Sequence, residues 1–279
     1  MLYHLFKYFD NVHNLPGAGM FQYISFRAAA AIIIALLIVI VFGRNIINFL
    51  RRKQIGEEIR DLGLEGQLQK KGTPTMGGVI ILLAILIPVL LFGQLDNVYI
   101  QLMLVSTIWL GLIGFLDDYE KVKHHQNLGL TVIQKFLLQL VAAVAFLCLM
   151  RFEGMLTPNL YVPFFNTYII FSWPVYMVFA AFVIVGTVNA VNITDGIDGL
   201  AGSVTVPVGL FFSVLAFWWQ GYDQLGIYSA ALVGGLLGFL IYNFHPAKVF
   251  MGDTGSLFLG GTVAALAFAY DMPLVLIPV

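Results

Sequence analysis

The feature that most limits what this chain can fold into is the apolar run Ala28–Phe42, which contains no charged or hydrogen-bonding side chain. A membrane-spanning helix needs about 20 mostly apolar residues, and this run with its flanks reaches that length. A transmembrane β-barrel would instead show alternating segments of roughly ten residues. The run therefore predicts a membrane helix. No signal peptide is expected, because the run is long enough to span and no cleavage-type sequence follows it.

The rest of the chain is also strongly apolar. Hydrophobic residues make up 60% and charged residues 10%, whereas soluble domains have about 25% charged residues. No repeat with a period of 20–50 residues is visible. We expect an all-α polytopic bundle, with residues 1–279 forming one membrane domain. Its spans, about eight in number by length and hydropathy, are predicted near residues 24–43, 76–95, 98–116, 132–150, 171–191, 200–220, 226–244 and 256–277.

The loop charges predict how the bundle is oriented. Most Lys and Arg residues follow the first, third and seventh expected spans, and only Lys7, Arg27 and Arg151 fall on the other side. Because cytoplasmic loops carry the excess of positive residues, the N-terminus should lie outside. Ionisable groups at membrane depth are costly and usually functional. Several acidic residues fall at cytoplasmic ends, which predicts an active site open to the cytosol: Asp117, Asp118, Glu120, Asp195, Asp198 and Asp253.

Composition excludes several kinds of partner and metal site. The formal net charge is −1, so there is no basic surplus to bind nucleic acid. The one cysteine, Cys148, lies in an apolar run, so neither a disulfide framework nor a cysteine-rich metal site can form. Few histidines make zinc unfavourable. A carboxylate-rich site suits Mg²⁺, which proteins commonly hold with one or two carboxylates and substrate phosphates.

The segment Lys70–Gly78 combines two lysines, two threonines and three glycines at the start of the second expected span. Helix N-termini offer free N–H groups to anions, so the segment suits a phosphate group. The alternative is a basic flank followed by Thr and Pro helix-start signals. The segment is not a P-loop, because its lysines precede its glycines.

Asp117 and Asp118 end the third expected span. Adjacent helical residues point about 100° apart, so we expect the two carboxylates to have different roles. A solvated helix end is the alternative, although acidic residues at a helix C-terminus oppose the helix dipole.

Two further polar segments interrupt the apolar sequence. Residues 189–200 contain Asn192, Asp195 and Asp198, whose oxygens suit Mg²⁺ or sugar hydroxyls. Residues 243–256 contain Asn243, Phe250 and Asp253. Pro246 should end the seventh span. Asp253, Thr254 or Ser256 could be the N-cap of the eighth, and capping is the alternative interpretation of Asp253. Phe250 suits stacking on a base, or an interfacial aromatic belt, and His245 is interpreted as a structural hydrogen-bonding residue.

Oxygen ligands, lysines and a glycine-rich helix start together indicate phosphoryl transfer, which relies on positioning and charge neutralisation. A site at the cytosolic membrane surface can meet a nucleotide-activated donor and a lipid phosphate acceptor. Spacing alone predicts this reaction class and no specific substrate.

Four motifs resemble the phospho-N-acetylmuramoyl-pentapeptide transferase family of the polyprenyl-phosphate sugar-1-phosphate transferase superfamily. They are Lys-Lys-Gly-Thr-Pro-Thr-Met-Gly-Gly at 70–78, Asp-Asp-Tyr at 117–119, Asn-x-x-Asp-Gly-x-Asp-Gly at 192–199 and Met-Gly-Asp-x-Gly-Ser at 251–256. The resemblance implies transfer of phospho-MurNAc-pentapeptide from UDP to undecaprenyl phosphate with Mg²⁺, in the bacterial cytoplasmic membrane. The products would be UMP and the first lipid intermediate of peptidoglycan synthesis.

The resemblance also implies residue roles. Asp253 is the expected Mg²⁺ ligand, Asp117 the expected base that deprotonates the lipid phosphate, and Asp118 a supporting residue. Phe250 would stack on uracil, and Lys121 would contact the diphosphate. The full set expected to bind substrate is Lys70, Thr75, Lys121, Asn192, Asp195, Asp198, Asn243 and Phe250. Direct attack by the lipid phosphate and a covalent aspartate intermediate both remain open, and a homodimer is compatible with the resemblance.

One departure from the family is visible. Its members usually have ten spans and a cytoplasmic histidine-rich segment between the last two, whereas this sequence stops at Val279. We therefore expect this chain, purified alone, to be poorly active. Robust release of UMP would contradict that expectation.

Other functions remain as alternatives. Within the superfamily, the alternative is a transferase that uses UDP-GlcNAc, and an assay of both UDP-sugars with undecaprenyl phosphate would separate the two. A cation-coupled transporter would place its carboxylates near the midplane and often show internal repeats, and neither feature is seen. A lipid-binding scaffold would not need both Asp117 and Asp253.

Overall fold

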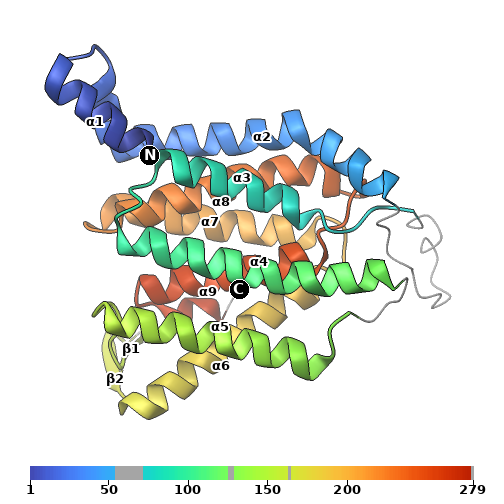
Figure 1. The fold of residues 1–279 in the computed structure, drawn as a ribbon. Coiled ribbons are helices and arrows are strands. Elements are labelled where there is room, and N and C mark those ends of the chain that lie inside the picture. The colour runs from blue at the N-terminus through green and yellow to red at the C-terminus, as the bar shows by residue number, and fades with distance from the viewer. Residues whose placement is uncertain (54–71, 125–128, 163–164, 278–279) are drawn as a thin grey trace.

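The computed structural model describes residues 1–53, 72–124, 129–162 and 165–277, and the long helices in these ranges lie side by side (Figure 1). Among the described residues, six helices are long and apolar enough to cross a membrane, so the chain is a multi-pass membrane protein. Lipid offers no hydrogen-bonding partners, so each crossing segment must pair its backbone groups internally as a helix. The six are α2 (Ile24–Arg52), α4 (Val98–Lys123), α5 (Val132–Phe152), α6 (Trp173–Thr194), α7 (Leu200–Trp218) and α8 (Asp223–Asn243).

The other two expected spans are helices of smaller length. α3 (Gly78–Phe92) has 15 residues and α9 (Gly252–Ala269) has 18 residues. The eighth span was predicted to run to residue 277, and this boundary is wrong. Asp271 adopts a left-handed conformation with φ 55°, and Pro273 then starts a short 3₁₀-helix, η3 (Pro273–Leu276), because proline has no N–H with which to continue α9.

Several elements at the N-terminus and between α5 and α6 were not predicted. An N-terminal helix, α1 (Leu2–His13), and a 3₁₀-helix, η1 (Ala18–Gln22), precede α2. A hairpin of β1 (Asn159–Val162) and β2 (Thr167–Ile170) connects α5 to α6. Its strands are antiparallel, with Asn159 opposite Ile170. These elements lie at one end of the bundle, opposite the end at which α4 and α6 finish (Figure 1).

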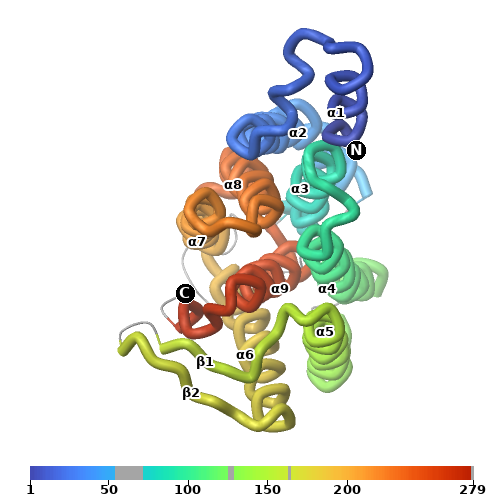
Figure 2. Tube along the Cα trace, turned by 90° about the vertical axis from the view of Figure 1, so that its left-hand side faces the viewer, coloured from blue at the N-terminus to red at the C-terminus, as the bar shows by residue number. Residues whose placement is uncertain are grey.

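α9 forms the centre of the bundle. Viewed along the helices it lies among α4, α6 and α8 (Figure 2), and every residue from Thr254 to Ala269 is buried. Small residues let membrane helices approach closely. At Gly261, for example, a Cβ atom would lie only 1.9 Å from Leu110 Cδ1 of α4. Such close packing explains how an 18-residue helix can hold several longer helices together.

Three buried side chains connect α4, α8 and α9 within the bundle. The Tyr228 hydroxyl forms hydrogen bonds with the Thr107 hydroxyl and, at 3.2 Å, with the Thr262 hydroxyl. Hydrogen bonds between membrane helices stabilise their packing, by about 1 kcal/mol each. The trio therefore helps to set the rotation of α4 relative to α9, and this rotation decides which residues meet at the helix ends.

Candidate functional site

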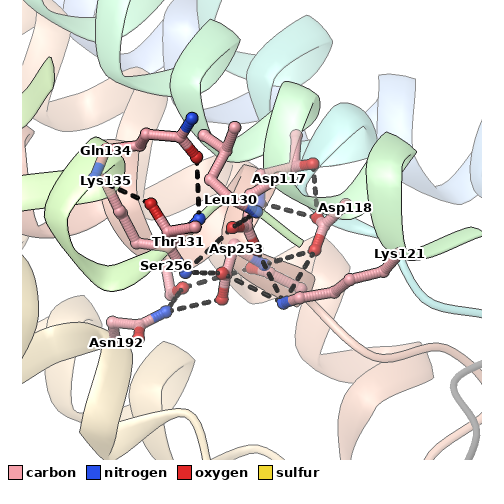
Figure 3. A network of polar contacts seen from close by, with 12 residues as sticks. Asp117, Asp118, Lys121, Leu130, Thr131, Gln134, Lys135, Asn192, Asp253 and Ser256 are labelled. Carbon is pink, nitrogen blue, oxygen red and sulfur yellow. Dashed lines mark hydrogen bonds and ion pairs between the residues drawn. The ribbon is translucent and has the colours of Figure 1, made fainter. Parts of the chain in front are cut away.

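Three carboxylates from two helices meet at one end of the bundle (Figure 3). Asp117 and Asp118 come from the last turns of α4, and Asp253 comes from the first turn of α9. One oxygen atom from each of them lies within 4.8 Å of the others. Asp117 and Asp118 are fully buried, at 0% and 1% exposure. Charges so far from water need partners nearby.

Two lysines supply positive partners for Asp117 and Asp253. Lys121 Nζ lies 2.7 Å from Asp117 Oδ2 and 3.1 Å from Asp253 Oδ2. Lys135 Nζ lies 2.5 Å from Asp253 Oδ2 and 3.2 Å from Asp117 Oδ1. Lys121 is one helical turn after Asp117 on α4, whereas Lys135 comes from the first turn of α5. Both ammonium groups bridge the same two carboxylates, as Figure 3 shows.

Asp118 also lies near Lys121, whose Nζ is 3.8 Å from its Oδ1, but its closest partners are different. Its Oδ1 accepts a hydrogen bond from the Asp253 backbone N–H at 3.1 Å, and its Oδ2 accepts bonds from the Thr254 backbone N–H at 2.8 Å and hydroxyl at 2.6 Å. The first N–H groups of a helix have no partner within that helix, and a carboxylate there is favoured by the helix dipole. Asp118 therefore caps α9 from α4.

This arrangement corrects one expectation and agrees with another. The prediction that Asp253, Thr254 or Ser256 caps the eighth span is wrong, because α9 has no side-chain cap of its own, and Asp118 accepts the N–H groups instead. The expectation of different roles for Asp117 and Asp118 agrees with their different partners. α4 continues as a helix through both residues, so their side chains reach the cluster from different directions.

Asn192 connects α6 to the same cluster. Its side-chain Nδ2 donates to Asp253 Oδ1 and to Ser256 Oγ, both at 2.8 Å. Asp253 thus has an amide on one oxygen and two ammonium groups near the other. Each of α4, α5, α6 and α9 contributes at least one side chain to this network.

Close contact between α4 and α9 is what brings these side chains within reach. A Cβ atom at Gly114 would lie 2.1 Å from the Asp253 backbone oxygen. Real Cβ atoms do not approach so closely, so only glycine fits at this position. Gly114 lies about one turn before Asp117 and Asp118, and it therefore sets the spacing of the two helices beside the cluster.

The described part of the glycine-rich segment lies against the loop that leads into α9. Phe250 N–H donates to the Pro74 carbonyl, and Gly77 N–H donates to the Phe250 carbonyl, each at 2.8 Å. A Cβ atom at Gly252 would lie 2.9 Å from Thr75 Oγ1 and 2.6 Å from Asp118 Oδ2. Thr75, which is buried at 7% exposure, is therefore next to the carboxylate cluster. Lys70 lies outside the described residues.

The remaining expected site residues lie around the turn between α6 and α7 and the loop before α9. Asn243 is buried, and its side chain accepts from Gly199 N–H at 3.0 Å and donates to the Val249 carbonyl at 2.9 Å. Asp198 Oδ2 accepts from Ala247 N–H at 3.3 Å and lies 3.1 Å from His245 Nδ1. Asp195 follows the last residue of α6 and is half-buried. The structure therefore joins this turn and this loop through polar contacts.

In the sequence, Lys135 served only as one of the positive loop charges that predict the orientation of the bundle, and it was not predicted to lie in the site. Its position follows from the start of α5, where Thr131 and Gln134 form a reciprocal capping box that fixes the first turn. The preceding Leu130 N–H donates to Asp117 Oδ1 at 2.9 Å. The Thr-x-x-Gln pattern was visible in the sequence and marks the helix start. It does not show that the next lysine reaches α9.

The cluster has the ligand chemistry of a divalent cation site. Its carboxylate oxygens are the hard donors that Mg²⁺ and Ca²⁺ prefer, and three carboxylates exceed the two ammonium groups by one negative charge. Asp118 accepts hydrogen bonds from the start of α9 on both oxygens, whereas Asp117 and Asp253 carry the oxygens that lie close to both lysines. The group can therefore hold a cation in the position that the two ammonium groups now share.

Comparison with known protein families gives two matches. Residues 100–271 match the model of glycosyl transferase family 4. Residues 70–82 match signature 1 of phospho-N-acetylmuramoyl-pentapeptide-transferase. The first match covers the helices that carry the cluster, and the second covers the glycine-rich segment that packs beside it.

Curated relatives resemble the chain along its whole length. The phospho-N-acetylmuramoyl-pentapeptide-transferase of Flavobacterium psychrophilum is 39% identical over 100% of this chain and 82% of the relative. That of Parabacteroides distasonis is 40% identical over 100% of the chain and 79% of the relative. That of Porphyromonas gingivalis is 41% identical over 96% and 76%, respectively. The chain thus spans about four-fifths of the length of these relatives.

Proposed function

Because the chain belongs to the phospho-N-acetylmuramoyl-pentapeptide-transferase family, we propose that it transfers phospho-MurNAc-pentapeptide from UDP-MurNAc-pentapeptide to undecaprenyl phosphate. The observation that carries this proposal is the cluster of three carboxylates and two lysines at one end of a membrane helix bundle. Such a position lets a water-soluble nucleotide and a membrane-bound phosphate reach the same atoms.

The transfer exchanges one phosphorus–oxygen bond for another. An oxygen of the lipid phosphate attacks the phosphorus that carries the sugar, and the bond from that phosphorus to the bridging oxygen breaks. The bridging oxygen and its electron pair leave with UMP. Asp117 is the proposed acceptor of the proton on the lipid phosphate. Its buried carboxylate lies 2.7 Å from one ammonium group and 3.2 Å from the other.

Mg²⁺ is the proposed cofactor, and Asp253 is its proposed ligand. When bound, the ion would neutralise charge on the diphosphate, as metal ions do in phosphoryl transfer. Lys121 and Lys135 would neutralise the remaining charge of the carboxylates and of the substrate phosphates. Asn192 orients Asp253 by donating to its other oxygen at 2.8 Å.

The nucleotide is proposed to lie between the glycine-rich segment, the turn between α6 and α7, and the loop before α9. Lys70 and Thr75 would contact phosphate, and Phe250 would stack on uracil. Asn192, Asp195, Asp198 and Asn243 complete the proposed pocket. Phe250 is held by backbone hydrogen bonds on both sides, and this fixes the loop from which its half-buried ring projects. The proposed location is the cytoplasmic face of the bacterial cytoplasmic membrane.

The test is transfer of radiolabelled phospho-MurNAc-pentapeptide into a lipid-extractable product, using this chain in liposomes that contain undecaprenyl phosphate. We expect Mg²⁺-dependent transfer, which should fall at least 100-fold in Asp253→Asn, since a charge-assisted interaction contributes about 1.5–3 kcal/mol and metal coordination adds to it. The Flavobacterium psychrophilum relative serves as the positive control for the assay conditions.

Two outcomes would contradict the proposal. One is no transfer by this chain under conditions in which the relative is active. The other is transfer that survives Asp253→Asn without change. A parallel assay with UDP-GlcNAc distinguishes the alternative donor, and we expect no transfer from it.

A further inference from the structure

We propose that α1 is a membrane-surface helix, whose exposed apolar face inserts into the lipid–water interface at the end of the bundle opposite the carboxylate cluster. This inference concerns a different part of the molecule and goes beyond the proposed function. Leu5, Tyr8 and Val12 recur at helical spacing, and their side chains are 46%, 57% and 54% exposed. Spacings of three and four residues place them on one side of the helix.

The side of the helix next to this apolar face is polar. His4, Lys7 and Asn11 are exposed and follow the same spacing. Residues two apart on a helix point about 200° from each other, so Leu5 and Lys7 face nearly opposite directions. A helix with separate apolar and cationic faces is the pattern of helices that lie in the plane of the membrane surface.

The packing contacts of α1 with the described part of the protein leave this apolar face exposed. α1 is attached through another side of its surface, where Phe6 stacks on Phe21 of η1 with ring centroids 3.9 Å apart, and through His4, whose Nε2 lies 3.3 Å from Asp96 Oδ1. Phe21 in turn contacts Phe92 at the end of α3. Gln22 donates to Asp10 Oδ2 at 2.8 Å. These contacts fix the rotation of α1 about its axis. The side that carries Leu5 therefore points away from the rest of the protein.

The position of α1 indicates lipid as the occupant. Figure 2 shows α1 beyond α2 at the edge of the bundle, and Figure 1 shows it at the end where α2 begins. The outer surface of α2 exposes large apolar residues such as Ile33 (55%) and Leu37 (49%), as expected for a surface that faces acyl chains. The exposed face of α1 extends this apolar perimeter at the level where α2 leaves the membrane.

Aromatic residues mark the same level. Trp and Tyr side chains concentrate at membrane–water interfaces. Tyr23 at the start of α2 is 68% exposed, and Trp218 at the end of α7 is 80% exposed. Tyr8 of α1 is a further exposed aromatic residue at this end of the bundle. Lys7 on the polar face is suited to lipid phosphates or water.

Site-directed spin labelling tests the proposal directly. Leu5→Cys and Lys7→Cys are made in the full chain with Cys148→Ser, labelled, and placed in lipid nanodiscs that hold one copy each. Accessibility to oxygen and to a water-soluble nickel complex is then compared. We expect the Leu5 label to favour oxygen and the Lys7 label to favour nickel, with a several-fold difference between their accessibility ratios. Equal exposure of both labels to the nickel complex would overturn the proposal.

Two further measurements keep the result decisive. Val12→Cys and Asn11→Cys repeat the comparison further along α1, so that failure of one variant to fold does not decide the outcome. Nanodiscs that hold two copies test whether a second copy of this chain is the true occupant. Shielding of the Leu5 and Val12 labels only in the two-copy discs would overturn the assignment to lipid.

Discussion

Thr254 donates two hydrogen bonds to Asp118 Oδ2, one from its backbone N–H at 2.8 Å and one from its hydroxyl at 2.6 Å. The two residues are far apart in the sequence, yet this contact holds the start of α9 against the end of α4. It places Asp253, the residue between Gly252 and Thr254, beside Asp117. By capping α9, Asp118 thus fixes the position of Asp253, which is the proposed Mg²⁺ ligand.

Asp118→Asn should weaken the fold more than it weakens metal binding. The amide keeps the shape of the side chain but loses the charge and one acceptor oxygen, so we expect the free energy of unfolding to fall by about 1–3 kcal/mol. Denaturation in detergent micelles measures this change. Thr254→Val, which removes only the hydroxyl bond, should lower it by about 1 kcal/mol. Unchanged stability together with lost Mg²⁺ affinity would show that Asp118 is instead a ligand.

Lys135→Met should reduce transfer activity by roughly 10- to 100-fold, which corresponds to the 1.5–3 kcal/mol of a charge-assisted hydrogen bond. The reason is that Lys135 neutralises both Asp117 and Asp253. The radiolabel transfer assay measures the effect. Lys123→Met is the matched control, because Lys123 lies over the Tyr119 ring, away from the cluster, and should leave activity unchanged. Equal effects of both substitutions would argue for a general loss of surface charge.

Mg²⁺ should raise the unfolding temperature of this chain relative to EDTA, because a ligand that binds the folded state stabilises it by mass action. At a concentration 100 times the dissociation constant the gain is about 2.7 kcal/mol. Asp253→Asn should abolish the shift. Lys135→Met should enlarge it, since three carboxylates then face only Lys121. A shift that persists in Asp253→Asn would place the cation elsewhere.

Gly114→Ala should separate α4 from α9 and lower both stability and activity, because the added methyl group would lie 2.1 Å from the Asp253 carbonyl oxygen. Gly186→Ala in α6 is the matched control. Apart from its chain neighbours and the nearby backbone of α6, no atom lies within 4 Å of the Cβ position there, so the exchange should be neutral or stabilise the helix by up to about 1 kcal/mol. Thermal unfolding of the two variants in one detergent provides the comparison. A tolerated Gly114→Ala would mean that the two helices are not held at this distance.

The membrane helices could be predicted because their signal is local. A run such as Ala28–Phe42 must hydrogen-bond to itself in lipid, whatever surrounds it, so each expected apolar span is a helix in the structure. The end of α9 was misplaced because Tyr270–Ile277 is apolar enough to continue a span. The backbone turn at Asp271 is not encoded in hydropathy. α1 was missed because its 12 residues are fewer than the about 20 that a membrane span needs.

The residue types of the candidate site could also be predicted from the sequence. That these residues lie close together in space could not. Glycine, asparagine and aspartate in otherwise apolar sequence are conspicuous, which is why Asp117, Asp118, Asn192 and Asp253 were singled out. The sequence by itself thus determined the membrane class, the helices and the type of chemistry. Only the tertiary structure decided that Lys135 bridges two of the aspartates and that Asp118 caps α9. Such contacts depend on the rotation and separation of α4, α5 and α9, which are set by packing between segments distant in the chain.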